Sequence, residues 1–320
     1  MLLPHLLVSA ALFGAIAFGV RTGQAQDFPN KPIRIITDGA GTGNDLMARL
    51  VAQGIAGPLG QPVIVDNRSP SDRPVAIVMK APPDGHTLLL TGGSLWNAPL
   101  LRKTFYDPLK DFSPVTTISR EVMVLVVSPS LAVTSTKELI ALAKTKPGGL
   151  NYGSAAAGGS GHLAGELFKL MAGVNIVRVP HKSSSAALTS VIGGDVQMML
   201  SSTGTAMPHV KSGRVKALAV GSAAPSPLAP GLPTVAATVP GYEATSLTGI
   251  FAPANTSAAI KNRLSQQVTR YLTTAEAREQ FLNVGLETVG GSPEELAAAI
   301  KADVARVTRV IKEAGIRVEE

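Results

Sequence analysis

Residues 151–171 read NYGSAAAGGSGHLAGELFKLM, and this stretch decides how the rest of the chain is interpreted. Its first five residues have the composition of a short buried strand, and residues 160–172 have helical spacing. Glycines at 158, 159 and 161 let the backbone approach a ligand closely. Because the first turn of a helix carries unpaired N–H groups and partial positive charge, the segment predicts an anion-binding helix start. The same glycines also fit a plain strand-to-helix turn.

Exact motif checks narrow the possible chemistry of this loop. A nucleophile elbow needs glycine two residues after the serine, but His162 stands there. Nothing in the sequence matches the P-loop pattern, and the glycines at 39 and 41 fail GxGxxG because Asn44 occupies the last position. An exported serine hydrolase or lyase that uses Ser160 with His162 or His181 remains an alternative, although no orienting acid can be assigned from spacing.

The composition is that of an ordered protein large enough for two domains. The chain has 320 residues, of which 45% are hydrophobic and 16% are charged. The absence of cysteine excludes disulfides, thiolate metal sites and a lipoprotein attachment cysteine. The net charge is +7, but Lys and Arg are scattered and aromatic residues make up only 4%, which argues against a nucleic-acid partner. A basic surface that steers small anions fits better.

The N-terminal residues have the pattern of an export signal. An apolar run at 6–20 precedes TGQA at 22–25, whose small residues suit a signal peptidase. The run is shorter than the roughly 20 residues that span a bilayer. Residues 1–5 contain no Lys or Arg, which is atypical of such signals. We nevertheless predict a cleaved signal peptide at residues 1–25 and a mature chain in the periplasm.

From residue 32 onward, strand and helix signals alternate. A strand at 32–37, a glycine-rich loop at 38–43 and a helix at 44–56 repeat the order of the central stretch, and strands follow at 115–118 and 121–127. After a Pro-rich connector at 222–233 come a strand at 245–252 and three helix signals, the last of which starts with a capping box at 292–295. We predict an α/β fold of two domains, each a mostly parallel sheet flanked by helices, with residues 26–125 and 246–320 in one and residues 126–245 in the other. Two crossings between the domains imply a hinge.

Motifs along nearly the whole mature chain resemble a known family. They are KPIRII (31–36), DNR (66–68), PDGHTL (83–88), GGSGHL (158–163), VPHK (179–182), LPTV (232–235) and TGIFAP (248–253). In this order they resemble the periplasmic substrate-binding receptors of tripartite tricarboxylate transporters, the Bug or TctC family. The resemblance implies a periplasmic-binding-protein (Venus-flytrap) fold that holds a small organic acid between its domains and presents it to the transporter's membrane subunits. We accordingly expect a monomer without enzymatic activity or cofactor, although a ligand-loaded accessory of a membrane sensor is a further alternative.

The resemblance also implies which residues contact the ligand. Carried over by position, they are Asp38, Gly39, Ala40, Gly41, Thr42, Gly43 and Asn44 from the first domain, and Ser154, Gly158, Ser160, His181, Ser183, Ser201, Ser202 and Thr203 from the second. The family commonly has an aromatic residue at the position of Asp38, whose carboxylate would instead favour a ligand that carries an amine. The alternative is a loop aspartate that hydrogen-bonds its own backbone.

Three other side chains have competing interpretations. His162 is expected to cap or pack within its helix, whereas His181 is open between ligand contact and a surface role. The two histidines lack the i, i+4 spacing of metal ligands, so no metal site is predicted. Arg49 lies past the first turn of its helix and is expected in a solvated ion pair.

Overall fold

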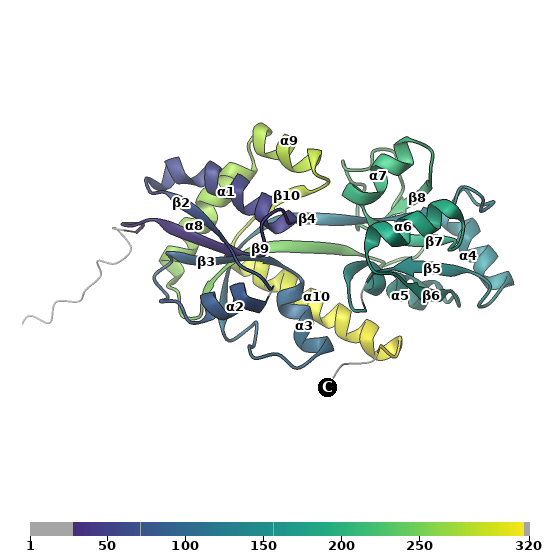
Figure 1. The fold of residues 1–320 in the computed structure, drawn as a ribbon, viewed down its shortest axis with the longest axis horizontal. Helices are drawn as coiled ribbons and strands as arrows, with labels where there is room; N and C mark the ends of the chain where they lie inside the picture. Colours follow the sequence, from purple (N-terminus) through teal and green to yellow (C-terminus); the bar gives the residue numbers. More distant parts are fainter. Residues whose placement is uncertain (1–27, 71, 156, 317–320) are drawn as a thin grey trace, which may run out of the picture.

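The computed structural model describes residues 28–70, 72–155 and 157–316. The predicted signal peptide at residues 1–25 lies outside these ranges. The described chain is an elongated α/β molecule with two halves at opposite ends of two long strands (Figure 1). Within this part of the chain, no helix combines the length and the apolar character that crossing a bilayer requires.

Strands from both halves form one mixed sheet. Its order is β2-β1-β3-β9-β4-β7-β5-β6, and β8 and β10 also pair with β4. Among the described strands, the pairs within β2-β1-β3 and β7-β5-β6 are parallel, and every antiparallel pair includes β4 or β9. The strands are β1 Ile33–Thr37, β2 Val63–Asn67, β3 Thr87–Gly92, β4 Phe112–Val127, β5 Asn151–Ser154, β6 Val177–Pro180, β7 Met198–Ser202, β8 Lys216–Val220, β9 Thr245–Pro253 and β10 Glu287–Gly290.

Strands β4 and β9 join the two halves. The part of β4 up to Val122 pairs with β9, and the part from Met123 to its end pairs with β7. The predicted strands at 115–118 and 121–127 are therefore one strand of 16 residues. Their separation was wrong because Ser119 and Arg120 resemble a polar break, whereas neighbouring residues of a pleated strand point to opposite faces of the sheet.

In each half, helices cover both faces of the sheet. In β1, Ile33 and Ile35 pack with α1 and α8, whereas Ile36 packs with α2, α3 and α10. The second half repeats this arrangement, with α4 and α5 on one face and α6 and α7 on the other. The helices are α1 Gly43–Leu59, α2 Asp72–Met79, α3 Ser94–Leu101, α4 Thr136–Thr145, α5 Ser160–Ala172, α6 Ser184–Gly193, α7 Thr203–Lys211, α8 Ala258–Leu272, α9 Ala275–Asn283 and α10 Pro293–Glu313, with a short 3-10 helix at Val235–Ala237. The predicted α/β class is confirmed.

Helix α10 lies along both halves (Figure 1). It begins with the predicted capping box, in which Ser292 Oγ accepts from Glu295 N at 3.2 Å and Ser292 N donates to the Glu295 carboxylate at 2.7 Å. Leu296 and Ile300 pack in the core of the first half, whereas Val310 belongs to the core of the second. The last helix therefore contributes to both cores.

Candidate functional site

A cavity of about 770 Å³ lies between the two halves. It is lined by the starts of α1, α3 and α5, by β4 and the beginning of β9, and by one side of α10. Five of the predicted contacts are among its lining residues, namely Thr42, Gly43, Asn44, Gly158 and Ser160. Two glycine loops that are far apart in the sequence thus face one cavity.

The loop of the first half ends in a capped helix. Thr42 Oγ1 accepts a hydrogen bond from Asp45 N at 3.2 Å, and the Asp45 carboxylate accepts one from Gly41 N at 2.8 Å. Gly41 has a φ of +82°, a conformation that favours glycine. Asn44 Nδ2 donates to the Asp38 carboxylate at 2.6 Å. Asp38 therefore holds Asn44 from within the loop, outside the cavity lining.

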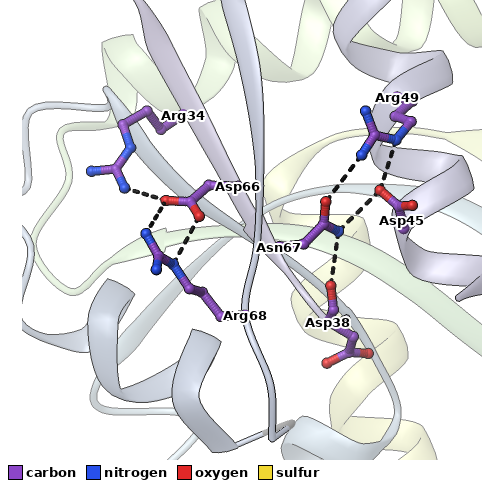
Figure 2. A network of polar contacts seen from close by, with 7 residues as sticks. All are labelled: Arg34, Asp38, Asp45, Arg49, Asp66, Asn67 and Arg68. Carbon is purple, nitrogen blue, oxygen red and sulfur yellow. Dashed lines mark hydrogen bonds and ion pairs between the residues drawn. The ribbon is translucent and has the colours of Figure 1, made fainter. Parts of the chain in front are cut away.

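A network of polar contacts fixes this loop against β2 (Figure 2). Asn67 Nδ2 donates to the Asp38 carbonyl and to the Asp45 carboxylate, both at 2.9 Å. Arg49 contacts Asn67 Oδ1 at 3.0 Å and Asp45 Oδ1 at 2.8 Å, which confirms the predicted ion pair of this arginine. Burial raises the pKa of Asp45, but the hydrogen bonds it accepts and the charge of Arg49 outweigh burial and hold the pKa below its ordinary value. The loop is therefore fixed before any ligand arrives.

The loop of the second half has no capping side chain. Helix α5 begins after Gly159, and among the described residues no side chain caps its first turn. Gly158 has a φ of +74°, and a Cβ at this position would overlap Leu101 of α3. Gly158 N donates to Nδ1 of the buried His162 at 2.8 Å, which confirms a packing role for this histidine. Burial, with the charge of Arg178, lowers the pKa of His162 to about 4, so the ring is neutral at pH 7.

The sequence interpretation missed the start of α3. This helix begins at Ser94 after Gly93, and like α5 it has no capping side chain. Gly93, Ser94 and Asn97 line the cavity. The signal that would have identified it is the pair of glycines at the end of β3, Gly92 and Gly93, followed by Ser94, which repeats the order of strand, glycine and helix seen in the other two loops.

The remaining predicted contacts lie outside the lining of this cavity. They are Asp38, Gly39, Ala40, Gly41, Ser154, His181, Ser183, Ser201, Ser202 and Thr203. Ser154 accepts a hydrogen bond from Arg178 Nε at 2.7 Å, and Ser183 caps α6. Thr203 donates to the Gly285 carbonyl of the other half at 3.0 Å. Direct contact of these residues with a ligand stays a prediction.

The two histidines considered as catalytic bases are bonded elsewhere. His181 places its ring nitrogens 2.9 Å from the Val179 carbonyl and the Ser190 hydroxyl. Nδ1 of His162 accepts from the backbone, as described above. In the described ranges, no hydrogen bond joins Ser160 to either histidine. This arrangement does not activate Ser160 as a nucleophile.

Comparisons with known proteins agree with one another. The model of the tripartite tricarboxylate transporter family receptor (TctC) matches residues 47–316. A UPF0065 protein of Bordetella bronchiseptica is 33% identical over 307 residues, covering 94% of this chain and 91% of that protein. The structure of R. palustris Rpa4515 with adipate is 35% identical, with a TM-score of 0.74, and covers 91% of this chain and 99% of that one. MatC from Rhodopseudomonas palustris with bound malate is 26% identical, with a TM-score of 0.69, over 89% and 99% of the two chains.

A cavity between two halves, walled by helix starts from both, is typical of solute-binding receptors, the class to which this fold belongs. The chain belongs to the tripartite tricarboxylate transporter receptor family, which confirms the resemblance seen in its motifs. Proteins of this family are periplasmic solute-binding receptors rather than enzymes.

Proposed function

We propose that this protein captures a small organic acid in the cavity between its halves and presents it to the membrane subunits of a tripartite tricarboxylate-type transporter. It acts as a monomer in the periplasm after removal of residues 1–25. One observation carries the proposal: α1, α3 and α5 all begin at the cavity, two of them from one half and one from the other.

Helix starts suit a carboxylate because they supply N–H donors and about half a unit of positive charge each. At α3 and α5 no capping side chain competes for these donors. The hydroxyl of Ser160 and the amides of Asn44 and Asn97 also line the cavity. The adipate of Rpa4515 and the malate of MatC are carboxylates held by relatives, which supports the same ligand class here.

Neutral donors bind the acid because the cationic side chains of the lining are engaged within the protein. In the described lining these side chains are Arg102 and Arg306. Arg102 pairs with Asp72 at 3.0 Å. Arg306 pairs with Asp303 and donates to the carbonyl of Glu243. Affinity then depends on how well the backbone amides fit the ligand's oxygens.

Binding closes the two domains around the ligand. We assign residues 26–125 and 246–320 to one domain and residues 126–245 to the other, with β4 and β9 as the hinge. The pairing of β4 with strands of both halves supports this assignment. A ligand that contacts both domains stabilises the closed form by the difference between its affinities for the closed and open forms.

The first experiment identifies small molecules that copurify with the mature chain by mass spectrometry. Calorimetry and thermal shift then follow with monocarboxylates and dicarboxylates, adipate and malate included. We expect saturable binding, and a loss of about tenfold in affinity for each of Ser160→Ala and Asn44→Ala. Ser185→Ala, on the exposed face of α6, is the matched control and should bind as the wild type does. No heat and no shift across the whole panel would contradict the proposal.

Presentation to a transporter needs a separate test. Crosslinking of the loaded receptor to membranes of its native host should capture the transporter's membrane subunits, and the ligand-free receptor should capture less. Capture of a membrane sensor instead of the transporter's subunits would show that the loaded receptor acts in signalling rather than in transport.

A further inference from the structure

The charged groups that line the cavity are mainly acidic. In the described lining they are the carboxylates of Glu121, Glu243 and Asp303 and the guanidinium groups of Arg102 and Arg306. Asp303 accepts hydrogen bonds from Trp96 Nε1 at 2.7 Å and Asn97 Nδ2 at 3.2 Å. It also pairs with Arg306. Asp303 is therefore engaged within the protein and has little capacity left for a ligand.

Glu121 differs from Asp303 because the described chain gives its carboxyl group a single partner. It lies on β4 opposite Ser246 of β9, and both line the cavity. The hydroxyl of Ser202 contacts its carboxyl group, and the same hydroxyl lies 2.9 Å from Thr205 Oγ1. An ionised carboxylate has about four acceptor sites, so most of the capacity of Glu121 is unused. Burial raises its pKa and the Ser202 contact offsets this only partly, as expected for a charge without a cationic partner.

We infer that the ligand is an amino-carboxylate whose ammonium group contacts Glu121 while its carboxylate occupies the starts of α1, α3 and α5. The inference rests on the proposed function, because the same cavity holds the ligand. An ammonium group would make a charge-assisted hydrogen bond with Glu121, whereas a second carboxylate would bring two like charges together. Asp38, which the sequence suggested for amine selection, is bonded to Asn44 and lies outside the lining.

The first experiment compares matched ligands on the wild-type mature chain by calorimetry at pH 7. Each pair has the same carbon spacer, with one carboxylate replaced by an ammonium: succinate and 3-aminopropanoate, glutarate and 4-aminobutanoate, adipate and 5-aminopentanoate. We expect the amino member of the best-fitting pair to bind at least about tenfold more tightly than its diacid. Tighter binding of the diacid in every pair would overturn the inference and leave the proposed function intact. Absence of binding by all six compounds would also overturn the inference, whereas the proposed function is contradicted only when the wider panel of carboxylates fails to bind as well.

The second experiment assigns the preference to one residue. Glu121→Gln keeps the shape of the side chain and its contact with Ser202 but removes the charge, so the preference for the amino member should fall at least about tenfold. Glu279→Gln, an exposed change of the same kind on α9, controls for net charge and should leave the preference unchanged. Glu243→Gln tests the other carboxylate of the lining. An unchanged preference in Glu121→Gln, or its loss in Glu243→Gln alone, would overturn the assignment.

Discussion

The starts of α1 and α5 carry the same order of strand, glycine and helix, but different interactions hold them. At α1, polar side chains of its own half fix the loop. The hydroxyl of Thr42 caps the helix, and Figure 2 shows the network of Asp45, Asn67 and Arg49. At α5 no described side chain caps the helix. The shape of this loop depends instead on the positive φ of Gly158 and on the close approach of Gly158 to Leu101 of the other half. The first loop should therefore respond mainly to changes in charge, whereas the second should respond mainly to side-chain volume and, through His162, to acid.

The largest effect is expected at Gly158. Gly158→Ala places a side chain at a positive φ and against Leu101, so it should lower the free energy of unfolding by about 2–3 kcal/mol, measured by urea denaturation. Adding Leu101→Ala should remove the overlap and leave only the backbone strain. Gly57→Ala in α1 is the control, because no atom lies within 4 Å of its added Cβ, and it should be neutral or stabilising. If Gly158→Ala were as stable as the wild type, side-chain volume at position 158 would not determine the conformation of this loop.

Asp45→Asn tests the polar loop. It keeps the shape of the side chain but removes a charge whose pKa is lowered by its hydrogen bonds and by Arg49, so unfolding at pH 7 should become easier by about 2 kcal/mol. Wild-type Asp45 stabilises the fold fully above its unfolded pKa, and this contribution disappears as pH falls through the lower folded pKa. The difference between the two chains should therefore shrink on acidification, as measured by denaturation at pH 7 and pH 3. If the difference in free energy of unfolding between the two chains did not change with pH, the shape of the Asp45 side chain rather than its charge would stabilise the loop.

His162→Asn tests the pH response of the second loop. The folded ring stays neutral down to a pKa of about 4, whereas the unfolded histidine takes up a proton near 6.5, so acid favours unfolding between these values. The asparagine side chain keeps an acceptor for Gly158 N and does not titrate. We expect the wild type to lose about 1–2 kcal/mol more than the variant between pH 7 and pH 4.5, measured by chemical denaturation. Parallel pH profiles of the two chains would contradict the assigned protonation state.

The smallest effect is expected for the neighbouring ion cluster on β1 and β2. Arg34 and Arg68 both pair with Asp66, and the Arg34 side chain is 47% exposed (Figure 2). Arg34→Gln should therefore change the free energy of unfolding by less than about 1 kcal/mol and leave ligand affinity unchanged in calorimetry. A larger change would mean that this cluster supports the α1 loop as well.

Local patterns predicted the local elements of this protein well. Helix α5 begins and ends at the residues expected from its spacing, because its glycines and apolar positions lie within one short stretch. The two glycine loops of the cavity were found for the same reason. Helix α3 was missed because it is short and contains Pro99. Glu121 and Asp303 were missed because only the folded chain brings β4 and α10 to one cavity. Their roles depend on partners such as Ser202 and Trp96, which are distant in the sequence.

Helix α10 has a consequence for how the polypeptide acquires its shape during biosynthesis. It follows the other described helices in sequence, and through Leu296, Ile300 and Val310 it contributes to the apolar interior of both halves. A nascent chain that still lacks this segment leaves apolar surface exposed in each half, so neither half reaches its final stability before residues 293–313 have been synthesised. The apolar cores of both halves are thereby completed only after this segment has been made.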